Sequence, residues 1–118
     1  MSVSLPAVTR SLKLQKRAAK EGFDWKKPED SLKKVKEELN ELSFEMKRNN
    51  KKKIREELGD LLFSSIKLSR KLGIDTETVR RESNRKFEKR FKKMEKKMNK
   101  KSLKWELKNL EKEWQNSK

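Results

Sequence analysis

The chain has 118 residues, of which 31% are hydrophobic and 46% are charged, with 35 Lys or Arg against 19 Asp or Glu. This length accommodates one domain with its own core and is too short for two ordinary ones. Cys and His are both absent, which excludes a disulfide framework, a thiolate zinc site and His-based acid–base chemistry, so any bound metal ion needs oxygen ligands and would be Mg²⁺, Mn²⁺ or Ca²⁺.

The formal net charge of +16 is typical of a protein with an anionic partner, and nucleic acid, nucleotides and acidic lipid headgroups are all candidates. The positive charge is unevenly distributed. Residues 85–101 contain ten Lys or Arg against two Glu, whereas residues 37–45 contain four Glu and no basic residue. A basic stretch and an acidic segment therefore coexist in one chain.

The opening MSVSLPAVTRS lacks the apolar run of a signal peptide. No stretch approaches the roughly 20 apolar residues of a membrane span. We therefore expect a cytoplasmic protein that does not contact a membrane. Its low hydrophobic content favours self-association, because a monomer would bury little apolar surface against the entropy of ordering the chain.

Hydrophobic periodicity predicts an all-α protein, a helical bundle of four to five helices. The first expected helix spans residues 8–21 and stops at Gly22, with Val8, Leu12, Gln15 and Ala19 on one face. The second begins near Pro28, where Asp30 or Ser31 would cap it, and ends around Arg48. Its apolar positions, at steps of three and four residues, are Leu32, Val35, Leu39, Leu42 and Met46.

Asn49 and Asn50 predict a tight turn, after which a third helix continues to Gly73 and forms an antiparallel hairpin with the second. Its apolar period includes Ile54, Leu58, Leu61, Leu62, Ser65, Leu68 and Leu72. Asp75 is expected to cap a fourth helix, and a fifth is expected from Ser102 to about Trp114. The expected buried side of the fourth helix is formed by Val79, Phe87, Phe91, Met94 and Met98.

The two hairpin helices share an internal repeat, E-E-L-x-[E/D]-L-x-F, at residues 37–44 and 56–63. At about 100° per residue, the second and fifth positions of the repeat lie roughly 60° apart on one helix face. The hairpin can bring both acidic pairs to opposite walls of one cleft. These four carboxylates, which would repel one another without a cation, predict a site for a hard divalent ion. They are Glu38, Glu41, Glu57 and Asp60.

Ordinary surface ion pairs are the alternative interpretation of these acids. A lysine precedes an acid of the repeat by four residues at Lys33, Lys34, Lys52 and Lys53. Lys before Glu is the weaker orientation for such pairs. A surface ion-pair pattern also has no reason to repeat together with its flanking Leu and Phe.

The chain resembles the MazG family of nucleoside-triphosphate pyrophosphohydrolases, within the all-α NTP pyrophosphatase group. The resemblance rests on residues 14–19 (LQKRAA), residues 22–25 (GFDW), the two acidic motifs with Leu61-Leu62-Phe63, and residues 84–91 (NRKFEKRF). The opening from Leu5 onward looks like the start of the second of two related domains in full-length members, the one associated with catalysis. Because the resemblance covers nearly the whole chain, residues 1–118 are expected to form a single domain.

The resemblance implies hydrolysis of NTP or dNTP to nucleoside monophosphate and pyrophosphate, and housecleaning of the nucleotide pool is the expected role. It implies that Glu38, Glu41, Glu57 and Asp60 bind Mg²⁺, with Mn²⁺ as an alternative. Glu37 and Glu56 would order the site or its waters, and either one could be the base. The expected nucleotide-binding residues are Lys34, Lys53, Asn84, Lys86, Arg90, Trp114 and Lys118.

Within that set, Trp114 and Lys118 resemble a pair that covers the base of the nucleotide, on which an indole would stack. Docking of the tail helix through Trp105, Leu107 and Leu110 is the structural alternative for this aromatic tail. The family is also oligomeric, so a homo-oligomer is expected, either a dimer or a dimer of dimers.

Two other functions fit parts of the sequence. A basic helical nucleic-acid-binding module without catalysis would explain the +16 charge but would leave the acidic repeat without a role. An inactive helical interaction protein would use the Leu stripes as oligomer contacts and the acids only for solvation. Pyrophosphate release that depends on Mg²⁺ would separate the enzyme from both.

Overall fold

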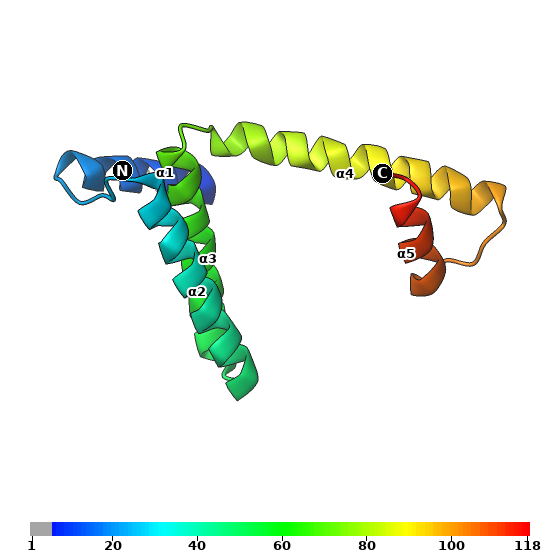
Figure 1. Ribbon diagram of the computed structural model, residues 1–118, viewed down its shortest axis with the longest axis horizontal. Coiled ribbons are helices and arrows are strands. Elements are labelled where there is room, and N and C mark those ends of the chain that lie inside the picture. The colour runs from blue at the N-terminus through cyan, green and yellow to red at the C-terminus, as the bar shows by residue number, and fades with distance from the viewer. Residues whose placement is uncertain (1–5) are drawn as a thin grey trace. The chain divides into compact units, whose positions relative to one another are not determined.

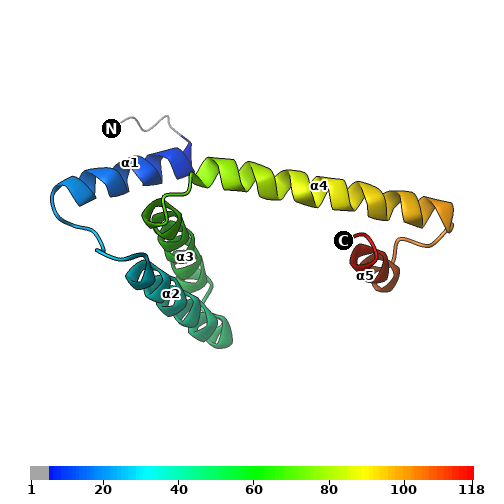
Figure 2. The same ribbon diagram turned by 45° about the horizontal axis from the view of Figure 1, so that its top comes forward.

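A computed structural model describes residues 6–118 of the chain (Figures 1 and 2). Leu5, the first residue of the opening segment in the family resemblance, lies outside the described residues. The helices are α1 (Ala7–Lys20), α2 (Pro28–Arg48), α3 (Lys51–Lys71), α4 (Thr76–Lys100) and α5 (Leu107–Gln115). No strand occurs in residues 6–118, so the all-α prediction is confirmed. Within the same residues, no helix combines the length and apolar character needed to cross a membrane.

The chain divides into two compact units, an N-terminal unit up to Glu77 and a C-terminal unit from Thr78 to Lys118. The N-terminal unit contains α1 and the hairpin of α2 and α3, which lie side by side in both views (Figures 1 and 2). Asn49 adopts the left-handed conformation at the end of α2, with φ of 55°. The side chain of Asn50 then accepts a hydrogen bond from the Lys53 amide at 3.2 Å, which caps α3. The predicted Asn49–Asn50 turn is confirmed.

The start of α2 differs from the expectation. Neither Asp30 nor Ser31 caps the helix, because it begins at Pro28, with Lys27 as the preceding residue. Proline suits the first helical position, since its fixed φ is already helical and its missing amide hydrogen would have had no partner there. Ser31 is instead 1% exposed, inside the N-terminal unit.

The contact surface of the hairpin is more polar than the periodicity predicts. The buried residues of α2 are Ser31, Glu38 and Glu45. These positions are seven residues apart, so they lie on nearly the same side of the helix. The shared apolar core expected from the Leu stripes is therefore wrong in part, because much of each stripe faces outward in the chain. Exposed members are Leu32 (42%), Leu39 (53%), Met46 (57%), Leu58 (45%) and Leu62 (58%).

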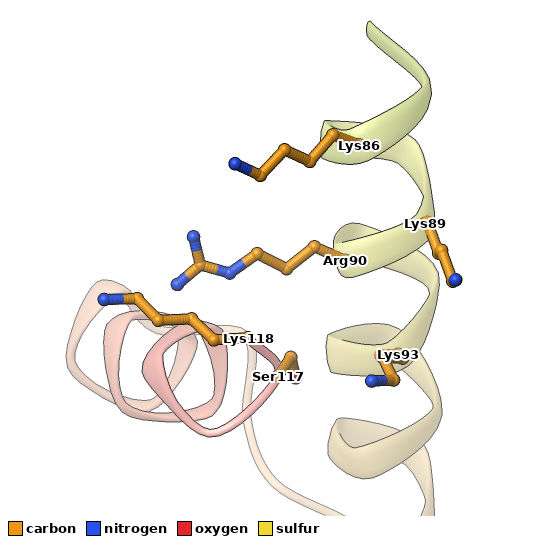
Figure 3. A pocket seen from close by; sticks show the side chains of 6 residues that line it. All are labelled: Lys86, Lys89, Arg90, Lys93, Ser117 and Lys118. Carbon is orange, nitrogen blue, oxygen red and sulfur yellow. The ribbon is translucent and has the colours of Figure 1, made fainter. Parts of the chain in front are cut away.

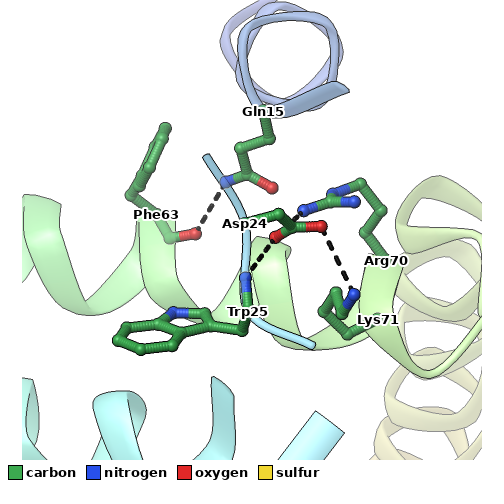
Figure 4. A network of polar contacts seen from close by, with 6 residues as sticks. All are labelled: Gln15, Asp24, Trp25, Phe63, Arg70 and Lys71. Carbon is green, nitrogen blue, oxygen red and sulfur yellow. Dashed lines mark hydrogen bonds and ion pairs between the residues drawn. The ribbon is translucent and has the colours of Figure 1, made fainter. Parts of the chain in front are cut away.

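A loop between α1 and α2 is fastened to α3 by polar contacts (Figure 4). Asp24 accepts hydrogen bonds from Arg70 Nη2 at 2.7 Å and from Lys71 Nζ at 3.3 Å. It also accepts one from the Trp25 amide at 2.9 Å. From α1, buried Gln15 donates through Nε2 to the Phe63 carbonyl at 3.1 Å. The hydrogen bond from Arg70 is the main cause that lowers the pKa of Asp24.

The C-terminal unit consists of most of α4 and all of α5. Met94 and Met98 of α4 are buried, as predicted, at 4% and 0% exposure. Val79 and Phe87 were expected on the same buried side, and they are instead exposed at 36% and 59%. Phe87 contacts the Trp114 ring of α5, with centroids 5.1 Å apart, but this contact leaves more than half of its surface exposed.

The fifth helix begins later than expected. Ser102 has a φ of 52°, a left-handed conformation that ends α4 and lets the Leu103 amide bond to the Met98 carbonyl at 3.0 Å. Residues 103–106 are not helical, and α5 starts at Leu107. Leu107 is 71% exposed, whereas Glu113 is 1% exposed and pairs with Lys101 Nζ at 2.7 Å. The tail therefore docks through the second half of α5 and through Trp105, whose ring centroid lies 6.2 Å from that of Phe91.

Substitution of Asp24 tests whether the loop depends on this ion pair. Asp24→Asn would leave Arg70 and Lys71, which are only 15% and 17% exposed, without their charged partner. We expect the free energy of unfolding to fall by about 1–3 kcal/mol in urea titrations. Glu88→Gln is the matched control, because the Glu88–Lys92 pair is exposed, at 65% and 67%, and should change stability by less than about 0.5 kcal/mol. Equal stability of the Asp24→Asn variant and wild type would contradict the prediction.

Candidate functional site

Three of the four predicted metal ligands lie together in the hairpin. One carboxylate oxygen from each of Glu38, Glu41 and Glu57 lies within 4.8 Å of the other two. We call these three residues the acid cluster. Asp60 is not part of this group, but its negative charge contributes to the raised pKa of Glu57, so it belongs to the same electrostatic environment. The cluster joins α2 to α3, as the antiparallel repeat predicts.

The acid cluster is short of positive charge and of hydrogen-bond donors. Glu38 is 5% exposed, and its Oε2 and that of Glu57 are buried without a hydrogen-bond partner among the described residues. Burial is the main cause that raises the pKa of Glu57 to about 7, followed by its hydrogen bond with Glu41 and the charges of Glu41, Glu38 and Asp60. Lys34 offsets part of this charge, with Nζ at 3.1 Å from Glu38 Oε1, and that contact raises the pKa of Lys34.

Buried carboxylate oxygens without donors are costly unless a cation binds them. The donor set contains oxygen alone, which is what Mg²⁺ and Mn²⁺ prefer over soft ligands. The residues of the acid cluster therefore fit a hard divalent ion, and Asp60 is the fourth predicted ligand of that ion.

Ion pairs with lysine account for only some of the acids in the repeat. Of the four Lys–acid pairs with a spacing of four residues, the described residues contain one, Lys34–Glu38. Lys34 Nζ also lies 3.6 Å from Glu37, and Lys53 Nζ lies 3.3 Å from Glu56. Both candidate bases are thus exposed acids beside a predicted nucleotide-binding lysine. The pairs leave Glu57, the most strongly perturbed acid, without a lysine partner.

A cavity of about 330 Å³ adjoins the acid cluster in the N-terminal unit. We call it the aromatic cavity, and it is lined by Phe23, Trp25, Lys34, Glu38, Asp60, Phe63, Ser64 and Lys67. Sequence reasoning did not single out Ser64 or Lys67. Ser64 follows Glu57 by seven residues, and this spacing is the signal that would have placed it on the same side of α3.

In the C-terminal unit, five cationic side chains surround a second cavity of about 270 Å³ (Figure 3). We call it the basic cavity, and its lining residues are Lys86, Lys89, Arg90, Lys93, Ser117 and Lys118. The structure thus brings together three predicted nucleotide-binding residues. Lys89 and Lys93 were missed, although positions 86, 89, 90 and 93 share one helix face. Asn84 does not line this cavity, and its Oδ1 accepts a hydrogen bond from Arg80 Nη2 at 2.8 Å.

Trp114 is tied to Arg90 within the same unit. The guanidinium carbon of Arg90 lies 3.9 Å from the centroid of the indole ring. Arg90 also donates to the Trp114 carbonyl from Nε at 3.0 Å and from Nη2 at 2.8 Å. Phe87 packs against the same indole, with centroids 5.1 Å apart. Trp114 therefore holds Arg90 in a fixed orientation beside the basic cavity.

Residues 26–95, more than half of the chain, match the model of the MazG nucleotide pyrophosphohydrolase domain. The chain belongs to this family. The matched segment contains both acidic motifs of this MazG-family chain and extends into both compact units. Residues 22–25 and α5 lie outside it.

Two relatives of this MazG-family chain are each about three times as long as the segment over which they match it. One, from Thermotoga maritima, is named nucleoside triphosphate pyrophosphohydrolase/pyrophosphatase MazG and is 40% identical over 83 residues, which cover 70% of this chain and 31% of the relative. Another, from Escherichia coli K12, is named nucleoside triphosphate pyrophosphohydrolase and is 38% identical over 87 residues, 72% of this chain and 33% of the relative. The chain thus spans about a third of the length of these relatives.

The raised pKa of Glu57 predicts an unusual pH dependence in the absence of metal. The folded-state pKa of about 7 exceeds the ordinary value of 4.5, so between these values the folded protein binds more protons than the unfolded chain. The stability contribution of Glu57 therefore falls as the pH rises from about 4.5 to about 7. We expect Glu57→Gln, in EDTA, to remove this fall in Tm and to be more stable than wild type above pH 7. Glu56→Gln, a change at the neighbouring exposed acid, is the control. Parallel Tm–pH curves for wild type and Glu57→Gln would contradict the prediction.

Proposed function

We propose that this MazG-family chain hydrolyses nucleoside triphosphates to nucleoside monophosphate and pyrophosphate in a reaction that depends on Mg²⁺ or Mn²⁺. The observation that carries the proposal is the convergence of Glu38, Glu41 and Glu57 within 4.8 Å. Glu38 and Glu57 each have a buried oxygen without a hydrogen-bond partner among the described residues, which a divalent cation would satisfy. The relatives are named nucleoside triphosphate pyrophosphohydrolases, which is the activity proposed here.

The acid cluster and Asp60 are the proposed metal ligands. A bound divalent ion would supply neutralisation of phosphate charge and acidification of water. Glu37 and Glu56 are the proposed proton acceptors, because each is an exposed carboxylate directly beside a residue of the cluster in the sequence. Their lysine partners, Lys34 at 3.6 Å from Glu37 and Lys53 at 3.3 Å from Glu56, would orient these carboxylates.

Phosphate binding is proposed for the predicted cationic residues of each unit. In the N-terminal unit these are Lys34 and Lys53, which flank the acidic repeat on α2 and α3. In the C-terminal unit they are Lys86, Arg90 and Lys118 around the basic cavity, with Asn84 and Trp114 as the remaining members of the predicted set. A triphosphate carries several negative charges, and converging cations are the usual means of binding it.

A housecleaning role in the nucleotide pool and a cytoplasmic location belong to the same proposal.

Nucleic-acid binding is the second candidate function, and the C-terminal unit favours it by its charge. Residues 78–118 contain sixteen Lys or Arg against six Glu, a net charge of +10. Affinity for duplex or single strands that falls steeply with salt, without pyrophosphate release, would support this candidate instead.

We also propose that the chain forms a homo-oligomer through the exposed Leu stripes of the hairpin. Leu39 and Leu62 are more than half exposed, at 53% and 58%. Exposed apolar residues in such a continuous series are typical of an interaction surface. A second copy would cover the same stripe on its partner, which gives a closed, symmetric dimer as the default arrangement.

Replacement of the proposed ligands tests the metal-dependent reaction. Glu38→Gln, Glu41→Gln, Glu57→Gln and Asp60→Asn should each lower pyrophosphate release by about 100-fold or more, because neutral amide oxygens bind Mg²⁺ poorly. Wild-type activity should be lost in EDTA and restored by added Mg²⁺. Glu29→Gln, at an exposed acid in the first turn of α2, should retain activity. Near-normal turnover in any two of the four variants, with helicity intact, would remove the metal-site proposal.

A charged residue in the Leu stripe tests the proposed dimer. Leu39→Glu places a charge where a second copy would bury an apolar side chain, and we expect sedimentation velocity to show a monomer where wild type sediments as a dimer or larger species. Leu107→Glu is the matched control, because Leu107 is 71% exposed but lies on α5 in the other unit. A monomeric wild type with full activity would refute the proposal.

A further inference from the structure

We propose that the chain binds double-stranded DNA through one face of α4, in addition to the nucleotide of the proposed reaction. We call this surface the basic face, and it consists of the nine Lys and Arg residues of the segment 85–100. The inference assigns an interface, a form of nucleic acid and a kind of contact. It is independent of the proposed hydrolysis.

Positive charge is fully segregated on this part of α4. At about 100° per residue, the nine cations occupy an arc of about 160° around the helix, and no other residue of 85–100 falls within that arc. The two acids of the segment, Glu88 and Glu95, lie outside the arc. The buried Met94 and Met98 also lie outside it. The basic face is therefore a continuous strip without acidic or apolar side chains.

Most of this charge is not compensated within the chain. Seven of the nine residues are exposed, and the other two, Arg90 and Lys97, donate hydrogen bonds to backbone carbonyls at the end of α5. Among the described residues, only Lys92 of the basic face forms an ion pair, with the exposed Glu88 at 3.1 Å. Six pairs of the cations lie four residues apart, a spacing at which like charges destabilise a helix. A bound polyanion would remove this repulsion.

The dimensions of the basic face match a DNA duplex. A helix rises roughly 22 Å from residue 85 to residue 100, and a duplex of that length carries about thirteen phosphates. The major groove of DNA admits an α-helix and has a strand of phosphates on either side. The cations at the two edges of the wide arc would therefore face opposite strands. A flat lipid surface would meet only one part of the arc, which has no apolar side chain to insert into it.

The composition of the basic face also indicates how it would bind. Proteins that bind single strands stack bases on aromatic side chains, and the arc contains no aromatic residue. The indole of Trp114, on α5, already has the guanidinium of Arg90 at 3.9 Å from its centroid. Seven of the nine cations are Lys, and contacts from Lys to phosphate carry no sequence information. Binding should therefore favour the duplex and be independent of its sequence.

Neutralisation of three exposed cations outside the basic cavity tests this interface. Wild type in EDTA should bind DNA duplexes of about 20 base pairs, whatever their sequence, with Kd of about 1–100 μM near physiological salt, as measured by fluorescence anisotropy. The triple variant Arg85→Gln, Lys96→Gln, Lys100→Gln should lower the slope of log Kd against log salt concentration by about 2–3, because each lost phosphate contact removes about 0.9. Its affinity at about 0.1 M salt should fall about 30-fold or more. Its helicity and its pyrophosphate release should be unchanged.

The triple variant Lys13→Gln, Arg17→Gln, Lys20→Gln is the matched control, because it removes the same three charges from exposed positions of α1 in the N-terminal unit. It should bind DNA with the wild-type slope. An equal loss of affinity in the two variants would overturn the proposal, since net charge alone would then explain binding. So would the absence of duplex binding at about 0.05 M salt, or tighter binding of single-stranded DNA, of an RNA duplex or of phosphatidylglycerol vesicles.

The same measurements separate this proposal from the proposed hydrolysis. Wild type that binds the DNA duplex but releases no pyrophosphate would refute the hydrolysis and retain the interface. Wild type that releases pyrophosphate but does not bind the duplex would retain the hydrolysis and refute the interface. Glu57→Gln, which is expected to lose hydrolysis, should bind the duplex as wild type does.

Discussion

The burial of acidic side chains between α2 and α3 is the constraint on which the rest of this structure depends. A hairpin of two helices is normally stabilised by an apolar seam, and here Glu38 and Glu45 occupy seam positions that Leu would otherwise fill. Buried carboxylates without donors cost free energy that the chain must recover elsewhere. A divalent cation would recover it at the acid cluster. The proposed ion binding would therefore offset a cost in stability that the bare chain has at this seam.

The same arrangement explains the exposed apolar surface. Because the seam faces are partly acidic, the Leu stripes lie about 100° away from them and point outward. In a chain with only 31% hydrophobic residues, the exposure of Leu39, Leu58 and Leu62 leaves a single copy with a small core. The proposed self-association and the proposed metal binding therefore rest on the same feature, which is the angular offset between the acidic and the apolar positions of α2 and α3.

The two units divide the proposed work by charge. The N-terminal unit has the acid cluster and the aromatic cavity, and the loop anchored by Asp24 connects the aromatic side chains to the helices. The C-terminal unit has the basic cavity, and Trp114 stacks on Arg90, one of its lining residues. The proposed hydrolysis of a triphosphate would use both charges, because it needs an acidic site for a cation and a basic site for phosphate.

The sequence by itself determined the all-α class, the Asn49–Asn50 turn and the pairing of the two acidic motifs, because periodicity, turn residues and helix geometry are local properties. It also determined the family, through motifs whose order is preserved. Tertiary structure alone decided that Glu38 is buried while Leu39 is exposed, since adjacent residues of a helix differ by about 100° and only the neighbouring helix selects which faces inward. It likewise decided that Arg90 stacks on Trp114 and that Asp24 binds Arg70 of α3. The partners are 24 positions apart in the first contact and 46 positions apart in the second. Periodicity carries no information about contacts at such separations.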